Sequence, residues 1–454
     1  MKYSIQKMLV AVVMCIITVT MYGQSSVKLP GRWEGTLELP NAKLRLALVV
    51  NEKDAVMYSI DQGNAPIKVS ETKFDGKSFE FSMPSVMASY KGELKDEETM
   101  SGEFTQGGVP FNLTLKRTAD KKDEEQKEYE TDLFKSTNVT FKNGDITLAG
   151  TLTIPKKGKN HPAAILVTGS GLQNRDEELF GHKPFLRIAE FLSNNGIAVL
   201  RYDDRGFAKS TGDTNGTTSD FLTDALKAVE YMRSLPNIDR SSVGIIGHSE
   251  GGLIAMMAAA DNKVNYIVSL AGPTMAGEDL VLLQSQKILK ASGAPDTQIE
   301  FATTLNKGVY NILKTQPDND KAKKEIDTFI EQMGIKSPQK DMLADQLNAS
   351  VSPWFREFLV ANPADYLTTI KCPALLMFGE KDLQVPDKEN MEIFNKLMNN
   401  KTPKNFTVTS VPGVNHLFQD AQKGTMDEYS NTENVSMNDK TLKLILDWLN
   451  KSVK

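Results

Sequence analysis

One stretch, residues 242–253 (SVGIIGHSEGGL), constrains the fold of this chain more than any other. Its first half is a short apolar run typical of a buried strand, and residues 253–260 are rich in alanine and methionine, which suit a helix. Ser249 falls on the tight turn between the two. Such a turn leaves no room for side chains two residues to either side, which explains Gly247 and Gly251. The stretch therefore predicts a nucleophile elbow with Ser249 at its tip.

The N-terminus has the pattern of a secretory signal peptide. Lys2 and Lys7 precede an apolar run from Met8 to Thr20, and Gly23 is a small residue at the expected cleavage point. We expect residues 1–23 to be removed and the protein to be exported to the bacterial periplasm or the extracellular space. The apolar run is short for a membrane span, so no stable span is expected and an uncleaved anchor is the less favoured alternative.

The charge and the cysteine count limit the classes of partner and fold. The formal net charge is -5, and it becomes -7 after cleavage because Lys2 and Lys7 leave and no acidic residue does. A mildly acidic chain argues against nucleic-acid binding. Cys372 is the one cysteine of the mature chain, so no intramolecular disulfide is possible, and we interpret it as a packed core thiol.

Residues 24–118 alternate between apolar and polar side chains, which indicates strands. Asp75-Gly76 and Gly107-Gly108 are typical of hairpin turns. The opening Gly31-Arg32-Trp33-Glu34-Gly35 resembles the first strand of lipocalin-like β-domains. We predict a small antiparallel all-β domain, a lipocalin-like barrel or a sandwich, and favour a structural or docking role over ligand binding.

The rest of the chain has a different pattern. Residues 119–132 are charged and polar and predict a linker, although a solvated helix fits as well. In residues 133–454 strands are separated by helical stretches, which predicts an α/β domain with a mostly parallel sheet. Residues 275–366 interrupt this alternation with helical patterns and predict a helical cap. Its aromatic residues Trp354, Phe355 and Phe358 fit a lining above Ser249 or the cap's own core equally well.

A serine nucleophile needs a base, and the usual base is a histidine. The four histidines are His161, His182, His248 and His416. His248 is adjacent to Ser249 and points elsewhere in a tight elbow, His161 precedes a strand at its far end, and His182 follows an early strand. His416 directly follows the last predicted strand, in a loop that belongs on the Ser249 side of the sheet. We therefore expect His416 to be the base.

An acid is needed to orient the histidine, and the loop after Phe378 offers Glu380, Asp382 and Asp387. Asp382 is the preferred acid and Glu380 the substitute. The chain order Ser249, Asp382, His416 matches the order found in α/β-hydrolases.

Acyl transfer also needs backbone donors for an oxyanion. One is expected to be the amide of Glu250, the residue after the nucleophile. The other is expected in the turn Thr168-Gly169-Ser170-Gly171-Leu172, at Leu172 or Gly171. A merely flexible glycine-rich turn is the alternative interpretation of this segment. The turn is no phosphate loop, because no Gly-Lys-Ser/Thr follows it.

Three motifs carry a family resemblance: GSGLQNRDE at residues 169–177, RYDDRG at 201–206 and GHSEGG at 247–252. They resemble bacterial α/β-hydrolase fold serine esterases over about residues 133–449. The resemblance implies a carboxylesterase with Ser249, Asp382 and His416 as its triad, although the same group is closely related to acyltransferases, thioesterases and serine peptidases.

These observations predict a cofactor-independent serine hydrolase that cleaves carboxylic esters, with short acyl chains favoured, through an acyl-enzyme. The expected substrate is a small-molecule or glycan-linked acyl ester. No metal is expected, because the few histidines lack ligand spacing. The rivals are a serine peptidase or acyltransferase on the same fold and, from another class, a non-catalytic glycan- or lipid-binding protein.

Overall fold

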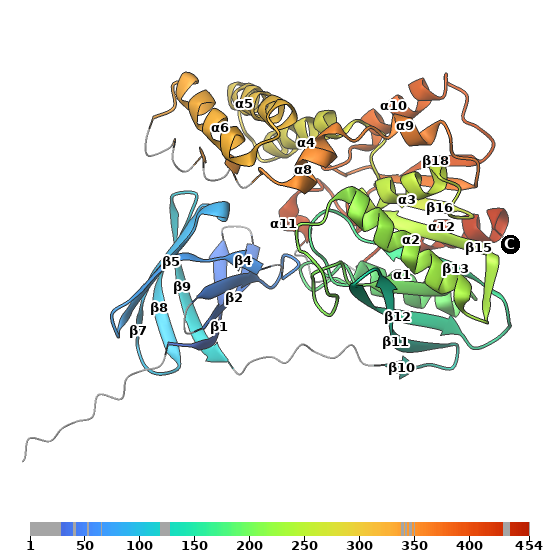
Figure 1. The fold of residues 1–454 in the computed structure, drawn as a ribbon, viewed down its shortest axis with the longest axis horizontal. Coiled ribbons are helices and arrows are strands. Elements are labelled where there is room, and N and C mark those ends of the chain that lie inside the picture. Colours follow the sequence, from blue (N-terminus) through green and yellow to red (C-terminus); the bar gives the residue numbers. More distant parts are fainter. Residues whose placement is uncertain are drawn as a thin grey trace, which may run out of the picture.

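The computed structural model of the chain describes most of the sequence. The described residues are 29–39, 42–51, 54–64, 66–118, 128–336, 340, 343–344, 347–348, 350–429 and 436–453. The expected signal peptide lies outside them, as does most of the expected linker. The described chain forms a domain of strands, an α/β domain and a group of helices that lies above the α/β domain and extends over the domain of strands (Figure 1).

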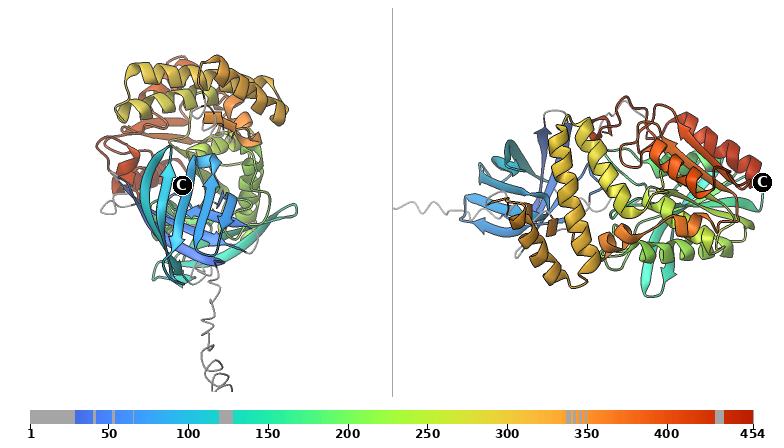
Figure 2. Two further views of the ribbon diagram at one scale, coloured as in Figure 1. Left: turned by 90° about the vertical axis from the view of Figure 1, so that its left-hand side faces the viewer. Right: turned by 90° about the horizontal axis from the view of Figure 1, so that it is seen from above.

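The first domain is an antiparallel sheet of strands that follow one another in the chain. They are β1 (Gly31–Leu39), β2 (Ala42–Val50), β3 (Ala55–Ser59), β4 (Pro66–Lys68), β5 (Ser70–Phe74), β6 (Ser78–Met83), β7 (Ala88–Leu94), β8 (Thr99–Gln106) and β9 (Val109–Thr118), with a 3-10 helix η1 (Pro84–Val86). Their order is β4-β3-β2-β1-β9-β8-β7-β6-β5, so the two edge strands are neighbours in the chain. The sheet therefore curls into a nearly closed barrel (Figure 2).

Alternating side chains fill the interior of this barrel. In β7 every second residue is buried, as expected for a strand with one face toward a core. The interior contains the large side chains of Trp33, Phe79, Phe81 and Tyr90. The predicted antiparallel all-β domain is confirmed, in the form of a barrel with a packed interior.

The second domain is built on a mixed, mostly parallel sheet. Its strands are β10 (Tyr129–Glu130), β11 (Phe134–Asn143), β12 (Ile146–Pro155), β13 (His161–Val167), β14 (Ala198–Tyr202), β15 (Ile238–His248), β16 (Ile267–Leu270), β17 (Ala374–Gly379) and β18 (Phe406–Val411). Their order is β10-β11-β12-β14-β13-β15-β16-β17-β18, antiparallel up to β14 and parallel from there on. The predicted α/β-hydrolase topology is confirmed.

Helices cover this sheet. They are α1 (Pro184–Asn194), α2 (Thr218–Ser234), α3 (Glu250–Ala260), α10 (Asp387–Leu397) and α12 (Asp439–Ser452), whereas the short helix α11 (Met426–Tyr429) faces the barrel, whose core includes Tyr429. Helix α2 packs beside α3, and α1 packs beside α12. Because β13, β15, β16, β17 and β18 are parallel, the loops after them meet at one edge of the sheet.

One strand lies where the sequence indicated a linker. Tyr129 and Glu130 pair with Ser136 and Lys135 of β11 and extend the sheet by a short edge strand. The Tyr129 hydroxyl also donates to Glu190 of α1 at 2.6 Å. This strand could not be predicted from the sequence, because it follows a charged segment and its single aromatic side chain is too little to produce a period-two pattern.

A helical cap is inserted between β16 and β17. Its described helices are α4 (Gly277–Ala291), α5 (Asp296–Thr315), α6 (Asn319–Gln332), α8 (Pro353–Val360) and α9 (Ala364–Leu367), and the described residues of this insertion contain no strand. The cap has its own apolar core, which includes Leu305, Val309, Ile326 and Ile330. Since the chain leaves and re-enters the sheet at the edge where the parallel strands end, the cap lies above that edge (Figure 1).

Candidate active site

Ser249 lies on a strained turn at the end of β15. Its φ of 51° and ψ of -117° place a non-glycine residue in the left-handed region, as in a nucleophile elbow. Its amide donates to the main-chain oxygen of Leu270 at 2.8 Å. A Cβ atom on Gly247 would collide with the main-chain oxygen of Gly251, and one on Gly251 would collide with that of Val167. The turn exists because both glycines lack side chains.

His416 and Asp382 form a buried pair beside this turn. The Nδ1 atom of His416 lies 2.7 Å from Oδ2 of Asp382, and both side chains are almost fully buried. The other oxygen of Asp382 accepts from the amides of Gln384 and Val385, at 2.7 and 2.9 Å. Glu380, the alternative acid, instead accepts from the amide of Gly413 at 2.8 Å. The structure thus brings Asp382, and not Glu380, to His416.

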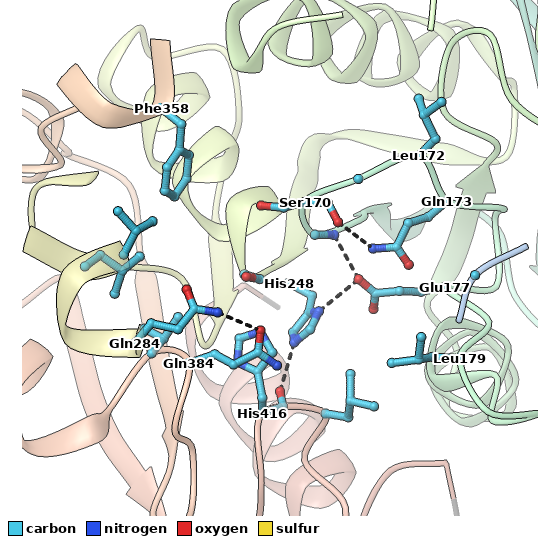
Figure 3. A pocket seen from close by; sticks show the side chains of 18 of the residues that line it. Ser170, Leu172, Gln173, Glu177, Leu179, His248, Gln284, Phe358, Gln384 and His416 are labelled. Carbon is cyan, nitrogen blue, oxygen red and sulfur yellow. Dashed lines mark hydrogen bonds and ion pairs between the residues drawn. The ribbon is translucent and has the colours of Figure 1, made fainter. Parts of the chain in front are cut away.

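Ser249 and His416 line the same cavity, which has a volume of about 430 Å³ and lies between the sheet edge and the cap. Figure 3 shows this cavity from close by. It is lined by Gln62, Gly63, Gly169, Ser170, Gly171, Leu172, Gln173, Glu177, Leu179, His248, Ser249, Leu280, Val281, Gln284, Trp354, Phe355, Phe358, Gln384, Val385, His416 and Leu417. Asp382 lies behind His416 and is not part of the lining.

The expected oxyanion donors lie around the same cavity. Glu250 is the first residue of α3, so its amide has no acceptor within the helix. Gly171 and Leu172 both line the cavity, and Gly171 has a φ of 92°. The turn passes close to the nucleophile, since a Cβ atom on Gly169 would lie 3.1 Å from Cβ of Ser249. Both candidate positions for the second donor are therefore at the cavity wall.

Two buried aspartates, Asp203 and Asp204, hold this turn in place. Asp204 accepts from the hydroxyl of Thr168 and from the amide of Gln173, both at 2.8 Å. Burial raises the pKa of Asp204 well above its ordinary value. Asp203 is paired with the buried Arg175 at 2.6 Å. These bonds tie the turn after β13 to the loop after β14.

Sequence reasoning missed a second histidine–carboxylate pair in the cavity. His248 lies between Glu177 and His416 (Figure 3): its Nδ1 atom is 2.8 Å from Oε1 of Glu177, and its Nε2 atom donates to the main-chain oxygen of His416 at 2.9 Å. The same oxygen of Glu177 accepts from the amide of Gly169 at 2.8 Å. The one signal in the sequence was the presence of Glu177 and His248 in two of the three resemblance motifs.

The two contacts of His248 indicate a charged ring. A carbonyl and a carboxylate both accept, so an imidazole bonded to both must donate from both nitrogens. Burial opposes the charge, but the attraction and hydrogen bond of Glu177 and the carbonyl of His416 outweigh it and raise the pKa of His248 above 6.5. His248 is therefore a fixed donor, in agreement with the expectation that it is not the base.

The side chain of Glu250 joins the elbow to the cap. Its carboxyl group accepts from the Thr218 hydroxyl at 2.5 Å and from Nε1 of Trp354 at 2.9 Å. Burial raises its pKa, and these hydrogen bonds partly oppose the rise. Trp354 and Phe358 stack with ring centres 5.7 Å apart. These two cap aromatics and Phe355 line the cavity, and Phe355 also packs against the apolar core of the cap, so both of the alternatives that the sequence left open hold.

The remaining histidines lie elsewhere. His161 begins β13, and His182 bridges to Leu179 in the loop before α1; neither lines the cavity. Within the described ranges, no group of histidine, cysteine and acidic side chains is suited to hold a metal ion. Over the same residues, no helix combines the length and the apolar character needed to cross a membrane.

Comparisons with known proteins identify a family and several similar proteins. Residues 143–417 match the family described as X-Pro dipeptidyl-peptidase (S15 family). The esterase EstD of Thermotoga maritima is 30% identical over 344 residues, which cover 75% of this chain and 73% of that protein. A polyketide transferase of Penicillium crustosum is 31% identical over 146 residues, 31% of this chain and 45% of that protein. An esterase structure from Pyrococcus furiosus aligns with a TM-score of 0.44 at 16% identity, covering 71% of this chain and 92% of that one.

Proposed function

Because the chain belongs to the S15 family of hydrolases and is homologous to an esterase, we propose that it cleaves carboxylic esters through an acyl-enzyme formed on Ser249. The observation that carries this proposal is the shared cavity of the Ser249 elbow and of His416, whose ring is bonded to Asp382. Those are the parts that a serine acyl-transfer reaction needs.

In the first half of the proposed reaction, Ser249 Oγ attacks the ester carbonyl carbon while Nε2 of His416 takes the hydroxyl proton. Asp382 holds Nδ1 of His416 as the donor, which leaves Nε2 free to accept. The amide of Glu250 and that of Gly171 or Leu172 donate to the carbonyl oxygen as it becomes negative. The C–O bond to the alcohol then breaks, and His416 returns the proton to the departing oxygen.

In the second half, water enters the site of the alcohol. His416 removes a proton from this water, which attacks the acyl carbon, and the bond to Ser249 Oγ breaks as Oγ regains a proton. The products are the acid and the free enzyme. Every proton in this cycle passes through His416, so no cofactor is required for it.

A short acyl chain is the proposed preference. Leu280, Val281, Phe355 and Phe358 give the cap side of the cavity an apolar wall, and Trp354 stands at its border with a second cavity of about 180 Å³. An acyl group of a few carbons can be buried against this wall, while a long chain must pass the indole of Trp354.

One observation favours a second candidate function, a dipeptidyl-peptidase activity, since the matching family carries that description. Such an enzyme must bind the free amino group of its substrate. Glu177 is the one carboxylate that lines the described cavity wall; its Oε1 atom is bonded to His248 and to the amide of Gly169, so this carboxylate already serves to hold these two groups. The ester is therefore the favoured substrate.

A direct comparison of substrates tests the proposed function. The full mature chain is assayed with p-nitrophenyl acetate, butyrate and octanoate and with Ala-Pro p-nitroanilide, which differ in the bond cleaved and in acyl length. We expect turnover of the short esters, less of the octanoate and none of the anilide. Turnover of the anilide alone would favour the peptidase activity. If none of the four substrates is turned over, the non-catalytic binding protein becomes the favoured interpretation.

We also propose that the protein acts outside the cytoplasm on small-molecule or glycan-linked esters, without a nucleic-acid partner. The support is the N-terminal sequence, in which two lysines precede an apolar run, together with the acidic net charge. Cell fractionation of a tagged full-length chain and N-terminal sequencing of the mature form test the export and the cleavage after Gly23.

A further inference from the structure

The β-domain contributes to the wall of the catalytic cavity. Gln62 and Gly63, which lie in the turn between β3 and β4, line the cavity together with Ser249 and His416. These two residues are about 190 positions from the nucleophile in the chain and belong to another domain. The barrel therefore contributes residues to the candidate active site and is not only an appendage of the α/β domain.

This turn is fixed in place. The main-chain oxygen of Asp61 accepts from the amide of Phe180 at 2.5 Å, across the boundary between the domains. The buried carboxylate of Asp61 accepts from the amide of Arg45 at 2.7 Å and from its guanidinium Nε at 2.8 Å. Phe180, Leu417 and Tyr429 of the α/β domain pack into the apolar core of the barrel. The two domains thus share a core at the point where the turn enters the cavity.

The side chain of Gln62 is also held. Its Oε1 atom accepts from the hydroxyl of Ser59 at 2.8 Å, which leaves the two N–H groups of the amide as donors for other partners. On the same side, Gln384 donates to the hydroxyl of Tyr429 at 3.2 Å, and Tyr429 is part of the barrel's core cluster. The β-domain therefore positions the amide of Gln62, and Tyr429 at the boundary between the domains positions that of Gln384, in the cavity that Ser249 and His416 also line.

The lining of the cavity combines apolar side chains with uncharged amides. The apolar side chains come mainly from the cap, and four glutamine amides also line the cavity: Gln62 from the β-domain, Gln173 and Gln384 from the α/β domain, and Gln284 from helix α4 of the cap. Among the described residues of the lining there is no lysine or arginine, and the one carboxylate is engaged by His248. Uncharged amides both donate and accept, so they match hydroxyl groups and form no ion pair with a charged ligand.

We propose that the β3–β4 turn of the β-domain, through Gln62, forms part of the alcohol-binding subsite and selects esters whose alcohol portion is uncharged and rich in hydroxyl groups, such as an acylated sugar. This inference rests on the proposed esterase function. The cap receives the acyl group and the β-domain side receives the alcohol. The barrel then acts as a specificity element of the active site and not as a separate carbohydrate-binding module.

Two esters of the same acid test this inference: methyl 6-O-acetylglucoside and cyclohexylmethyl acetate, which share the acyl group and the ring size but differ in hydroxyl groups. The ratio of their kcat/KM values is measured for wild type, Gln62→Met and Gln106→Met. Methionine keeps the length of glutamine and removes its amide. Gln106 is the matched control, because it lies at the end of β8 in the same domain and does not line the cavity.

We expect wild type to prefer the sugar ester and Gln62→Met to reduce this preference about tenfold, the effect of about one hydrogen bond to a hydroxyl group. Gln106→Met should keep the wild-type ratio. An unaltered ratio in Gln62→Met, or an equal loss on both esters, would overturn the inference. Hydrolysis of p-nitrophenyl acetate by wild type is measured alongside as a test of the esterase function itself. If wild type hydrolyses none of the three esters, the proposed esterase function is wrong, and the inference about Gln62 falls with it.

Discussion

His248 donates a hydrogen bond from Nε2 to the main-chain oxygen of His416 at 2.9 Å, and the two ring centres are 4.7 Å apart. On its other side His248 is bonded to Glu177, which also holds the amide of Gly169. A single carboxylate thus fixes both the loop of the proposed base and the turn of the proposed oxyanion donors. We infer that Glu177 is a positioning residue.

Glu177→Gln should therefore reduce kcat about tenfold or more, since a small displacement of catalytic groups is costly. KM should change less than kcat, because Glu177 is bonded to His248 and Gly169 and acts by positioning these groups and not by binding the substrate. The measurement is steady-state hydrolysis of p-nitrophenyl acetate. Glu178→Gln is the matched control, because Glu178 is the next residue, is paired with Lys183 and does not line the cavity. Equal effects of the two substitutions would contradict this role.

The same variant should change the dependence of stability on pH. The pKa of His248 is raised in the folded protein, so its contribution to the free energy of unfolding is fully present below its ordinary pKa of 6.5 and is lost as pH rises through the folded pKa. Glu177→Gln removes the main cause of the rise. The Tm of wild type should exceed that of the variant most at about pH 6, and the gap should narrow toward about pH 9. A gap that widens with pH would contradict the charged state of His248.

Asp382→Asn should lower kcat by about a thousandfold or more, because an amide stabilises the wrong tautomer of the catalytic histidine. Glu380→Gln serves as the control, since Glu380 is exposed and bonds the amide of Gly413. Both variants are compared with wild type on p-nitrophenyl acetate, with Tm as the check of folding. A large loss in Glu380→Gln and a small one in Asp382→Asn would reverse the assignment of the acid.

Trp354 lines both the catalytic cavity and the second cavity of about 180 Å³, as do Gly171 and Leu172, and it has the largest side chain of the three. Trp354→Ala should connect the two cavities, and the kcat/KM ratio of p-nitrophenyl octanoate to acetate should rise about tenfold, the value of a few buried methylene groups. Phe355→Ala is the comparison, because Phe355 lines the first cavity and not the second. If the two variants shift the ratio equally, Trp354 is not the boundary of the acyl site.

Gly247→Ala should destabilise the protein by more than about 4 kcal/mol or prevent folding, because its Cβ atom would overlap the main-chain oxygen of Gly251 in the elbow. Gly293→Ala, at a position with φ of 82° and open space around it, should cost only about 1 kcal/mol. Chemical denaturation measures both. Similar stabilities of the two variants would show that the tight elbow does not depend on Gly247.

The fold was predictable because its signals are local. Period-two alternation marks the strands of the barrel, and the apolar run before Ser249 marks a buried strand. The order of Ser249, Asp382 and His416 follows from the strands that they terminate, since parallel strands end at one edge of a sheet. The structure confirms the α/β-hydrolase architecture and the helical insertion for these reasons.

The contacts between distant segments could not be predicted from the sequence. Nothing in the sequence around Gln62 indicates that its turn reaches the catalytic cavity, because that depends on how two domains pack. The bond between His248 and Glu177 joins residues 71 positions apart, and neither pattern nor spacing specifies it. Long-range packing determines such contacts, and it leaves no periodic signal in either segment.

We propose that Ser249 forms the covalent intermediate with the help of His416. The most direct measurement is intact-protein mass spectrometry after treatment with a fluorophosphonate, followed by mapping of the modified peptide, for wild type, Ser249→Ala and His416→Ala. We predict one adduct in wild type, on Ser249 and not on the neighbouring Ser170, with none in Ser249→Ala and much slower labelling in His416→Ala. An adduct on another residue, or undiminished labelling of folded Ser249→Ala, would contradict the assignment.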